Sequence, residues 1–334
     1  MKFSKNTKLL ITGGTGSFGT GFVNYILENN MPFEKIVIFS RDEYKQDVLE
    51  KKIPLKFKKK FRFFLGDVRD RQRLKTAFED IDIVIHAAAL KQVPKAEYDP
   101  FEFIKTNILG SENVIHSALN TNVKKVVALS TDKASSPANL YGATKLCADK
   151  LFLAANNVKG WKNISFSVLR YGNVFGSRGS IYNNLLKNQK LVKVTDERMT
   201  RFHINLNEAI KLCIWTIQNT TGGEIVVPKL KSYKLVDLVK AISPNSKLSI
   251  IGIRPGEKIH EEMISVHDGP NVLELKDKYL ICSELNKERI YKSFLKKKFN
   301  VKKIRDDFFY RSDKNNFLSI SEIKKIHLKE MLKK

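Results

Sequence analysis

The chain of 334 residues is long enough to bury a large core, and its hydrophobic content of 42% is ordinary for a globular protein, so we expect two domains or one domain with a lobe. No apolar run is long enough to span a bilayer, and the polar, lysine-bearing start is no secretory signal, so we expect a cytoplasmic protein without a membrane partner. The net charge of +25 suggests nucleic-acid binding. The excess is mainly lysine spread along the chain, however, and no recognition helix or stacking motif accompanies it. We therefore favour a solvated surface without a nucleic-acid partner.

The three cysteines, Cys147, Cys213 and Cys282, lie far apart in the sequence. They show neither the spacing of metal ligands nor a disulfide framework, which fits a reducing cytoplasm. We therefore expect no metal site.

The first predicted element is a buried strand at residues 8–11, which runs into the turn Thr12-Gly-Gly-Thr-Gly-Ser-Phe-Gly19 and then into a helical pattern of apolar residues. The glycines let the backbone approach a pyrophosphate, and the helix N-terminus offers N–H groups and a partial positive charge. Gly13, Gly16 and Gly19 are spaced by three residues, unlike the G-x-G-x-x-G fingerprint, and an ordinary tight turn is the alternative. The strand and helix around them favour a dinucleotide site.

Further apolar runs alternate with helix-like stretches and predict strands at residues 36–39, 61–65, 81–86, 125–130 and 164–170. This pattern is typical of an α/β fold with a Rossmann-type, doubly wound parallel sheet. Ligands bind at the carboxyl ends of such strands. The residues that follow the predicted strand ends should therefore converge on one crevice: Gly13, Ser40, Asp67, Ala87 and Thr131. We expect His86, at one strand end, to be a satisfied buried histidine rather than a base.

The end of the second strand bears on the choice of cofactor. Arg41 stands where an acidic residue would bind the ribose 2′-hydroxyl of NAD, and Lys45 follows one turn later. Two cations favour a 2′-phosphate and hence NADP, with a plain surface cation as the alternative for Arg41. Asp67 suits the exocyclic amine of adenine, although capping of its own loop is nearly as good an explanation.

The pair Tyr141 and Lys145 spans one helical turn, so both side chains project from one face. An ammonium beside a phenol lowers the pKa of the phenol and lets it act as a base. Alone this pair is weak evidence, because such pairs are usually surface or half-buried residues. Asp132 and Lys133 would add a second acid/base pair near the same site. Cys147 falls on another helix face and is expected in the core.

The alternating pattern loosens after Asn173, where segments become short and mixed. We expect residues 1–173, with parts of about 202–226, to form a Rossmann dinucleotide-binding domain. The remainder of 174–334 would form a smaller C-terminal substrate-binding lobe. In that lobe Arg254 lies in a Pro-Gly-bounded loop and can hold a diphosphate bidentately.

The turn at 12–19, the Ala87–Ala89 run and the Tyr141–Lys145 pair are similar to those of extended short-chain dehydrogenase/reductases. More narrowly, the chain resembles the inverting UDP-N-acetylglucosamine 4,6-dehydratases of pseudaminic acid biosynthesis. The segments that carry this resemblance are residues 39–46, 66–70, 86–91, 130–134, 139–147, 170–174, 176–179, 199–202 and 251–258. They run through most of the chain, to about residue 285.

The resemblance implies a mechanism. Tyr141, kept accessible as phenolate by Lys145, would take the C4 hydroxyl proton, and Thr131 would hydrogen-bond the C4 oxygen. Lys133 would be the base for C5 and Asp132 the acid for the departing C6 hydroxyl. Lys133 must then be neutral part of the time, so burial or neighbouring cations must lower its pKa. The alternatives for Lys133 are a cation holding the pyrophosphate or an ion pair with Asp132, and we disfavour the pair because adjacent residues of an extended segment point apart.

The resemblance also implies two binding sets. The cofactor, NADP, would contact Gly13, Thr15, Gly16, Ser17, Phe18, Gly19, Ser40, Arg41, Lys45, Asp67, Val68, Ala87, Lys91, Tyr141 and Lys145. The substrate, UDP-N-acetylglucosamine, would contact Lys91, Asn173, Val174, Arg178, Thr195, Arg201, Arg254 and Glu257. Solvated surface is the alternative for the substrate set, and packing at the core edge is the alternative for Arg201.

A homo-oligomer, a hexamer by resemblance, and a role in flagellin or surface-glycan modification are further expectations. The rival functions are a UDP-sugar 4-epimerase, a retaining 4,6-dehydratase or a ketoreductase on the same scaffold. A cofactor-sensing or nucleic-acid-binding protein that lost the chemistry is disfavoured by the intact Thr131, Tyr141 and Lys145.

Overall fold

A ten-stranded sheet forms the centre of the computed structural model, which describes residues 3–177, 180–186 and 190–331. Its strand order is β15-β13-β14-β9-β6-β5-β4-β1-β2-β3. Seven neighbouring strands are parallel: β1 (Thr7–Thr12), β2 (Phe33–Ser40), β3 (Phe61–Leu65), β4 (Ile83–His86), β5 (Lys125–Thr131), β6 (Ser165–Tyr171) and β9 (Glu224–Pro228). The 3-2-1-4-5-6 order is that of a doubly wound Rossmann sheet and confirms the predicted fold class.

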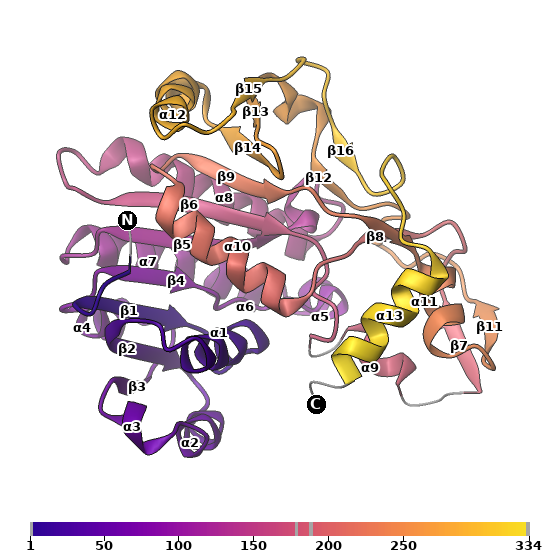
Figure 1. The fold of residues 1–334 in the computed structure, drawn as a ribbon, viewed down its shortest axis with the longest axis horizontal. Helices are drawn as coiled ribbons and strands as arrows, with labels where there is room; N and C mark the ends of the chain where they lie inside the picture. Colours follow the sequence, from indigo (N-terminus) through magenta and orange to yellow (C-terminus); the bar gives the residue numbers. More distant parts are fainter. Residues whose placement is uncertain (1–2, 178–179, 187–189, 332–334) are drawn as a thin grey trace.

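Helices cover both faces of this sheet (Figure 1). One face carries α1 (Ser17–Glu28), α2 (Glu43–Lys51), α10 (Leu206–Asn219) and α12 (Glu284–Lys296). The other carries α4 (Arg71–Phe78), α7 (Gly110–Leu119) and α8 (Leu140–Val158). Short helical segments are α3 (Leu55–Lys58), α5 (Val93–Tyr98), α6 (Pro100–Phe103) and the π-helix η1 (Ile104–Leu109). The central strands β4, β5 and β6 are largely apolar runs because both of their faces are buried.

The C-terminal half adds antiparallel strands to the same sheet and also builds a smaller, separate core. The added strands are β13 (Val272–Glu274), β14 (Lys278–Cys282) and β15 (Lys302–Lys303). The smaller core is surrounded by α9 (Ile181–Leu185), α11 (Leu235–Ile242), α13 (Ile320–Met331), β7 (Leu191–Val194), β8 (Thr200–Phe202), β10 (Ser232–Lys234) and β11 (Lys247–Ile250), at the right of Figure 1. We call this group the small lobe. Two antiparallel strands, β12 (Glu262–Ile264) and β16 (Tyr310–Arg311), complete the fold together with the 3-10 helix η3 (Val266–Asn271).

One expectation about α8 is wrong. Cys147 is exposed rather than in the core. The buried face of α8 follows the helical spacing of Tyr141, Lys145, Ala148 and Phe152, which turns position 147 toward solvent.

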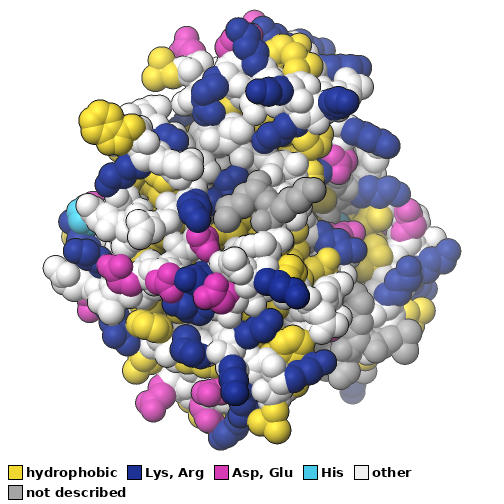
Figure 2. All heavy atoms as spheres, turned by 60° about the vertical axis from the view of Figure 1, so that its left-hand side comes forward, with side chains coloured by type: hydrophobic (Ala, Val, Ile, Leu, Met, Phe, Trp, Pro, Cys, Tyr) yellow, Lys and Arg dark blue, Asp and Glu magenta, His cyan; other side chains and the backbone are white. Residues whose placement is uncertain are grey.

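The surface is basic over a wide area. Figure 2 shows Lys and Arg side chains over most of the visible face, with Asp and Glu side chains among them rather than in one continuous stripe. Among the described residues, no helix is both long enough and apolar enough to cross a membrane.

Candidate active site

The glycine turn between β1 and α1 is closely packed against the end of β4. Gly13 has a φ of 65°, and a Cβ added there would lie 2.8 Å from the backbone nitrogen of Ala88. A Cβ at Gly19 would lie 2.3 Å from the carbonyl oxygen of Gly14, so neither position accepts a larger residue. The first turn of α1 carries no acidic side chain. This backbone fits the pyrophosphate of a dinucleotide, which would meet the N-terminus of α1.

His86 joins the ends of β1 and β4. Its Nδ1 lies 2.8 Å from the hydroxyl of Thr12 and its Nε2 lies 3.3 Å from that of Ser111. Burial, with a smaller contribution from Lys145, lowers the pKa of His86 to about 3. The imidazole is therefore neutral at physiological pH, and the expected satisfied buried histidine is confirmed.

The end of β2 places Arg41 beside the loop that follows β3. The Arg41 side chain is half exposed, with Nη1 3.5 Å from Oδ2 of Asp67. Arg69 holds the same carboxylate through Nε at 2.9 Å and Nη2 at 2.7 Å, and its backbone N–H donates to Oδ1. Asp67 thus structures its own loop, which was the alternative to adenine binding. Lys45 forms a close ion pair with Asp42, whereas Arg41 makes only a long contact with a carboxylate that Arg69 already holds. Arg41 is therefore the better candidate for a 2′-phosphate.

The segment after β5 forms a 3-10 turn, η2 (Asp132–Ala134), capped by Thr131. The Thr131 hydroxyl donates to Oδ1 of Asp132 at 2.9 Å and accepts from the backbone N–H of Lys133 at 3.3 Å. Asp132 is fully buried. Its Oδ1 also lies 3.1 Å from Nζ of Lys133, so our expectation that these neighbours point apart is wrong. With three residues per turn, adjacent side chains of a 3-10 turn leave the backbone about 120° apart rather than on opposite faces as in a strand, so the long Lys133 side chain can reach back to Asp132.

Tyr141 and Lys145 lie one turn apart on α8, as predicted. Asn139 caps this helix, with Oδ1 accepting from the backbone N–H of Gly142 at 2.8 Å. Tyr141 is 8% exposed, and burial raises its pKa to about 12 against the effects of Lys133 and of a hydrogen bond with Thr131. The pKa is thus above its ordinary value, contrary to expectation. The Lys145 ammonium donates to the carbonyl of residue 129 at 2.8 Å.

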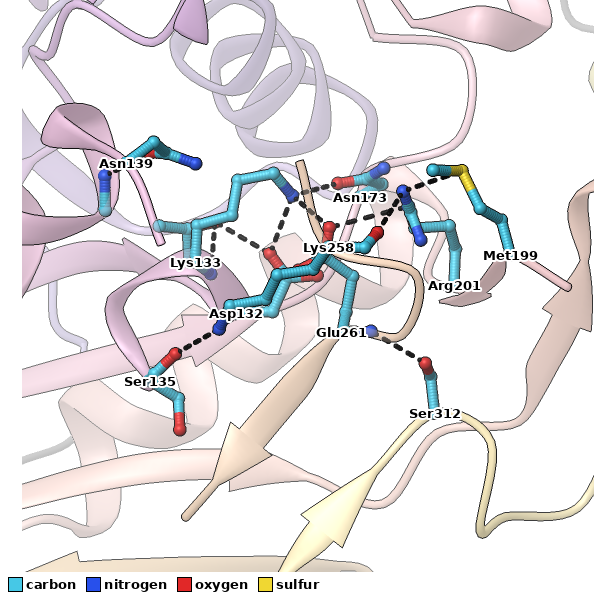
Figure 3. A network of polar contacts seen from close by, with 12 residues as sticks. Asp132, Lys133, Ser135, Asn139, Asn173, Met199, Arg201, Lys258, Glu261 and Ser312 are labelled. Atoms are coloured by element: carbon cyan, nitrogen blue, oxygen red, sulfur yellow. Dashed lines mark hydrogen bonds and ion pairs between the residues drawn. The ribbon is translucent and has the colours of Figure 1, made fainter. Parts of the chain in front are cut away.

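Lys133 is held by its neighbour Asp132 and by side chains from two other segments (Figure 3). Its Nζ donates to Oε1 of Glu261 at 2.9 Å and to Oδ1 of Asn173 at 3.3 Å, in addition to Asp132. Arg201 contacts the same carboxylate oxygen, because its Nε lies 3.4 Å from Oε1 of Glu261. Burial would lower the pKa of Lys133, but the two carboxylates outweigh it and raise the pKa. The expected lowering is therefore contradicted, because the neighbours of Lys133 are anions rather than cations.

The irregular segment at residues 256–262, which leads into β12, binds the segment around η2 and the start of α8 at several points (Figure 3). Asn139 Nδ2 donates to the carbonyl of Gly256 at 2.8 Å. Lys258 Nζ donates to the carbonyl of Ser135 at 2.7 Å. The hydroxyl of residue 136 donates to Oε2 of Glu262 at 2.7 Å. These contacts fix the position of η2 relative to the segment that enters β12.

The remaining predicted substrate residues are scattered around this network. Thr195 donates to the sulfur of Met199 at 3.0 Å. Arg201 is 8% exposed and donates to three backbone carbonyls, of residues 200, 258 and 259, so packing at the core edge accounts for most of its contacts. Arg254 is exposed, with its backbone N–H bound by Oε2 of Glu257. Val174 pairs with Ile204 in an isolated bridge, Lys91 is exposed after β4, and Arg178 lies outside the described residues.

Sequence reasoning missed two residues that shape this site. Asn107, in η1, binds both backbone groups of Leu90 at 2.9 Å and the hydroxyl of Thr144 at 3.0 Å, which ties the loop after β4 to α8. No sequence signal points to it. Glu261 stands beside Glu262 just after the matched segment 251–258, and that pair of carboxylates was the available signal.

The chain is similar to known proteins over most of its length. A family model described as polysaccharide biosynthesis protein matches residues 9–283. A UDP-N-acetylglucosamine 4,6-dehydratase (inverting) from Campylobacter jejuni subsp. jejuni serotype O:23/36 is 48% identical over 313 residues, 92% of each chain. A UDP-glucose 4-epimerase from Rickettsia canadensis is 36% identical over 329 residues, 96% of this chain and 95% of that protein. The X-ray structure of Pen from Bacillus thuringiensis superposes with a TM-score of 0.88 at 37% identity, covering 99% of this chain and 100% of the other.

Proposed function

Because the chain belongs to the polysaccharide biosynthesis protein family and is a relative of the inverting UDP-N-acetylglucosamine 4,6-dehydratases, we propose that it removes water from UDP-N-acetylglucosamine and inverts C5. The product would be UDP-2-acetamido-2,6-dideoxy-beta-L-arabino-hex-4-ulose, in the first step of pseudaminic acid biosynthesis. We also propose that the small lobe carries the substrate site and that the protein acts as a homo-oligomer, by likeness a hexamer.

The observation that carries the proposal is the meeting of a buried carboxyl and an ammonium, Asp132 and Lys133, at the end of β5. A ketoreductase or 4-epimerase needs Tyr141, Lys145 and a hydroxyl residue but no such pair. Burial, reinforced by the nearby Glu261 charge, raises the pKa of Asp132 although Lys133 opposes this. A carboxyl that keeps its proton suits an acid for the leaving hydroxyl.

NADP, the cofactor in this proposal, would be held by the glycine turn around Gly13 and by Arg41. When bound, it would supply the hydride acceptor for C4 and the hydride donor for C6. Tyr141 takes the proton of the C4 hydroxyl, and the resulting ketone acidifies C5–H. Lys133, once neutral, takes the C5 proton, while Asp132 protonates the C6 hydroxyl, which leaves as water. A proton then returns to C5 on the opposite face. The sum is loss of one water with no net change in oxidation state.

Incubation with UDP-N-acetylglucosamine in D₂O, followed by NMR, tests this function. We expect a 4-keto-6-deoxy sugar with deuterium at C5 and inverted configuration there, without consumption of added NADPH. The similarity to a UDP-glucose 4-epimerase makes epimerisation the second candidate. A sugar epimerised at C4 that keeps its C6 hydroxyl would establish that alternative, and retained C5 configuration would indicate a retaining dehydratase.

A further inference from the structure

Glu261 is a buried carboxylate whose position is fixed by the backbone. Its N–H donates to the hydroxyl of Ser312 at 2.9 Å, and its carbonyl accepts from the N–H of Ser312 at 2.8 Å. The residue is only 2% exposed. Oε1 faces Lys133 Nζ and Arg201 Nε, whereas Oε2 has no hydrogen-bond partner among the described residues. The side chain is therefore held toward Lys133 and cannot turn to solvent.

Asp132 and Glu261 share the ammonium of Lys133 (Figure 3). Oδ2 of Asp132 is, like Oε2 of Glu261, buried and unpartnered in the described structure. Two ionised carboxylates that share one ammonium in a largely buried site repel each other. Arg201 approaches only the glutamate. Glu261 therefore has two cations beside it and Asp132 only one, which it shares, so Asp132 is the carboxyl that holds a proton more readily.

We propose that Glu261 is a positioning residue of the active site, which anchors Lys133 through Oε1 and, by its negative charge, keeps a proton on Asp132. This inference rests on the proposed dehydration, in which Asp132 is the acid. Glu261 acts through its two neighbours and does not itself need to touch the sugar. It comes from the segment that enters β12, so that segment completes the acid/base group.

The charged and titratable groups around Glu261 come from each adjoining element. Lys133 and Asp132 face it from η2 and Arg201 faces it from β8, while Lys258 lies on its own segment and Tyr233 of β10 is close enough to feel its charge. Burial would raise the pKa of Glu261, but Lys133, Arg201 and Lys258 outweigh it and lower the pKa. The pKa of Asp132 is raised by burial and by Glu261. The pKa values of the two carboxyl groups are thus shifted in opposite directions, as in other sites where one carboxyl acts as an acid and the other stays ionised.

Infrared titration of the full-length protein without substrate tests this directly, because a protonated carboxyl group and a carboxylate absorb at different infrared frequencies. Asp132→Asn identifies the Asp132 band. We expect Glu261→Gln to lower the pH midpoint of that band by about one unit or more. Glu261→Met, which is also uncharged and of similar length, should lower the midpoint by a similar amount. It replaces the glutamine variant if that variant does not fold. Glu261→Asp, which keeps the charge, should lower the midpoint less.

Glu262→Gln is the matched control. This neighbouring carboxylate binds the hydroxyls of Ser135 and Ser136 instead of Lys133, so the Asp132 band should keep its midpoint. An unchanged midpoint in both uncharged Glu261 variants, or an equal shift in Glu262→Gln, would overturn the proposal. The titration needs no turnover. Failure of the wild-type protein to dehydrate UDP-N-acetylglucosamine would therefore refute the proposed function separately.

Discussion

The Nζ of Lys133 and Oε1 of Glu261 lie 2.9 Å apart, although 128 residues separate them in the chain. The first follows a central strand of the parallel sheet, and the second belongs to the segment that enters β12. The group of side chains that we propose for acid/base chemistry is therefore assembled only when these two parts fold together. Each of the following predictions depends on one part of that assembly.

Tyr141→Phe removes the phenol that we propose as the base for C4 oxidation. Because general-base catalysis contributes at least about 100-fold, we expect a loss of that order or greater in turnover, without accumulation of reduced nicotinamide. Stopped-flow absorbance of the enzyme-bound nicotinamide measures the oxidation step. Tyr291→Phe, on α12 and away from the site, is the control and should oxidise at the wild-type rate. Undiminished oxidation in Tyr141→Phe would rule out this role.

Lys133→Met should separate the two halves of the reaction. C4 oxidation by Tyr141 should persist, whereas deuterium incorporation at C5 and loss of water should fall by about 10²- to 10⁴-fold. NMR in D₂O and nicotinamide absorbance on the same sample report the two steps. Lys193→Met, on β7, controls for loss of a lysine. Normal C5 exchange in Lys133→Met would remove Lys133 from the mechanism.

Arg41 should determine the preference for NADP. Its half-exposed guanidinium is available for the 2′-phosphate, and a charge-assisted hydrogen bond of that kind is worth about tenfold or more in affinity. We expect Arg41→Met to weaken NADPH binding by that factor and to leave NADH binding nearly unchanged, as measured by fluorescence titration. Arg62→Met, on β3, is the matched control. Equal binding of both cofactors by the wild-type protein would contradict this prediction.

His86 should make stability depend on pH. Its pKa in the folded protein is about 3, against the usual 6.5. Between these two pH values the imidazole binds a proton in the unfolded chain but not in the folded protein. The contribution of the neutral His86 to the free energy of unfolding is complete above about pH 6.5. It is lost as the pH falls toward 3, by about 1.4 kcal/mol per pH unit. The free energy of unfolding of His86→Gln should therefore fall less steeply than that of wild type between pH 6 and 4.5, measured by urea denaturation.

The exposed His267 supplies the control for that experiment, because His267→Gln makes the same substitution outside the buried core. Its free energy of unfolding should run parallel to that of wild type. Parallel curves for wild type and His86→Gln would mean that His86 takes up its proton equally in the folded and unfolded protein.

The order of elements could be read from the sequence because each depends on local pattern. Buried parallel strands are largely apolar runs, and all six predicted strands are present. The edge strand β3 (Phe61–Leu65) is among them, although only Phe61 of its residues is buried. Helical periodicity likewise placed Tyr141 and Lys145 on one face of α8. The close approach of Gly13 to the β4 end explains why glycine is needed there.

Only the tertiary structure decided the charges around Lys133. The sequence determined that Asp132 and Lys133 follow β5, but the 3-10 turn brought their side chains together, and the placement of the segment before β12 added Glu261. These contacts reverse the expected lowering of the Lys133 pKa. A pKa depends on every charge and on the burial around a group, and these are set by residues distant in the chain. A sequence pattern shows which residues are neighbours along the chain, but it does not show which residues meet in the folded protein.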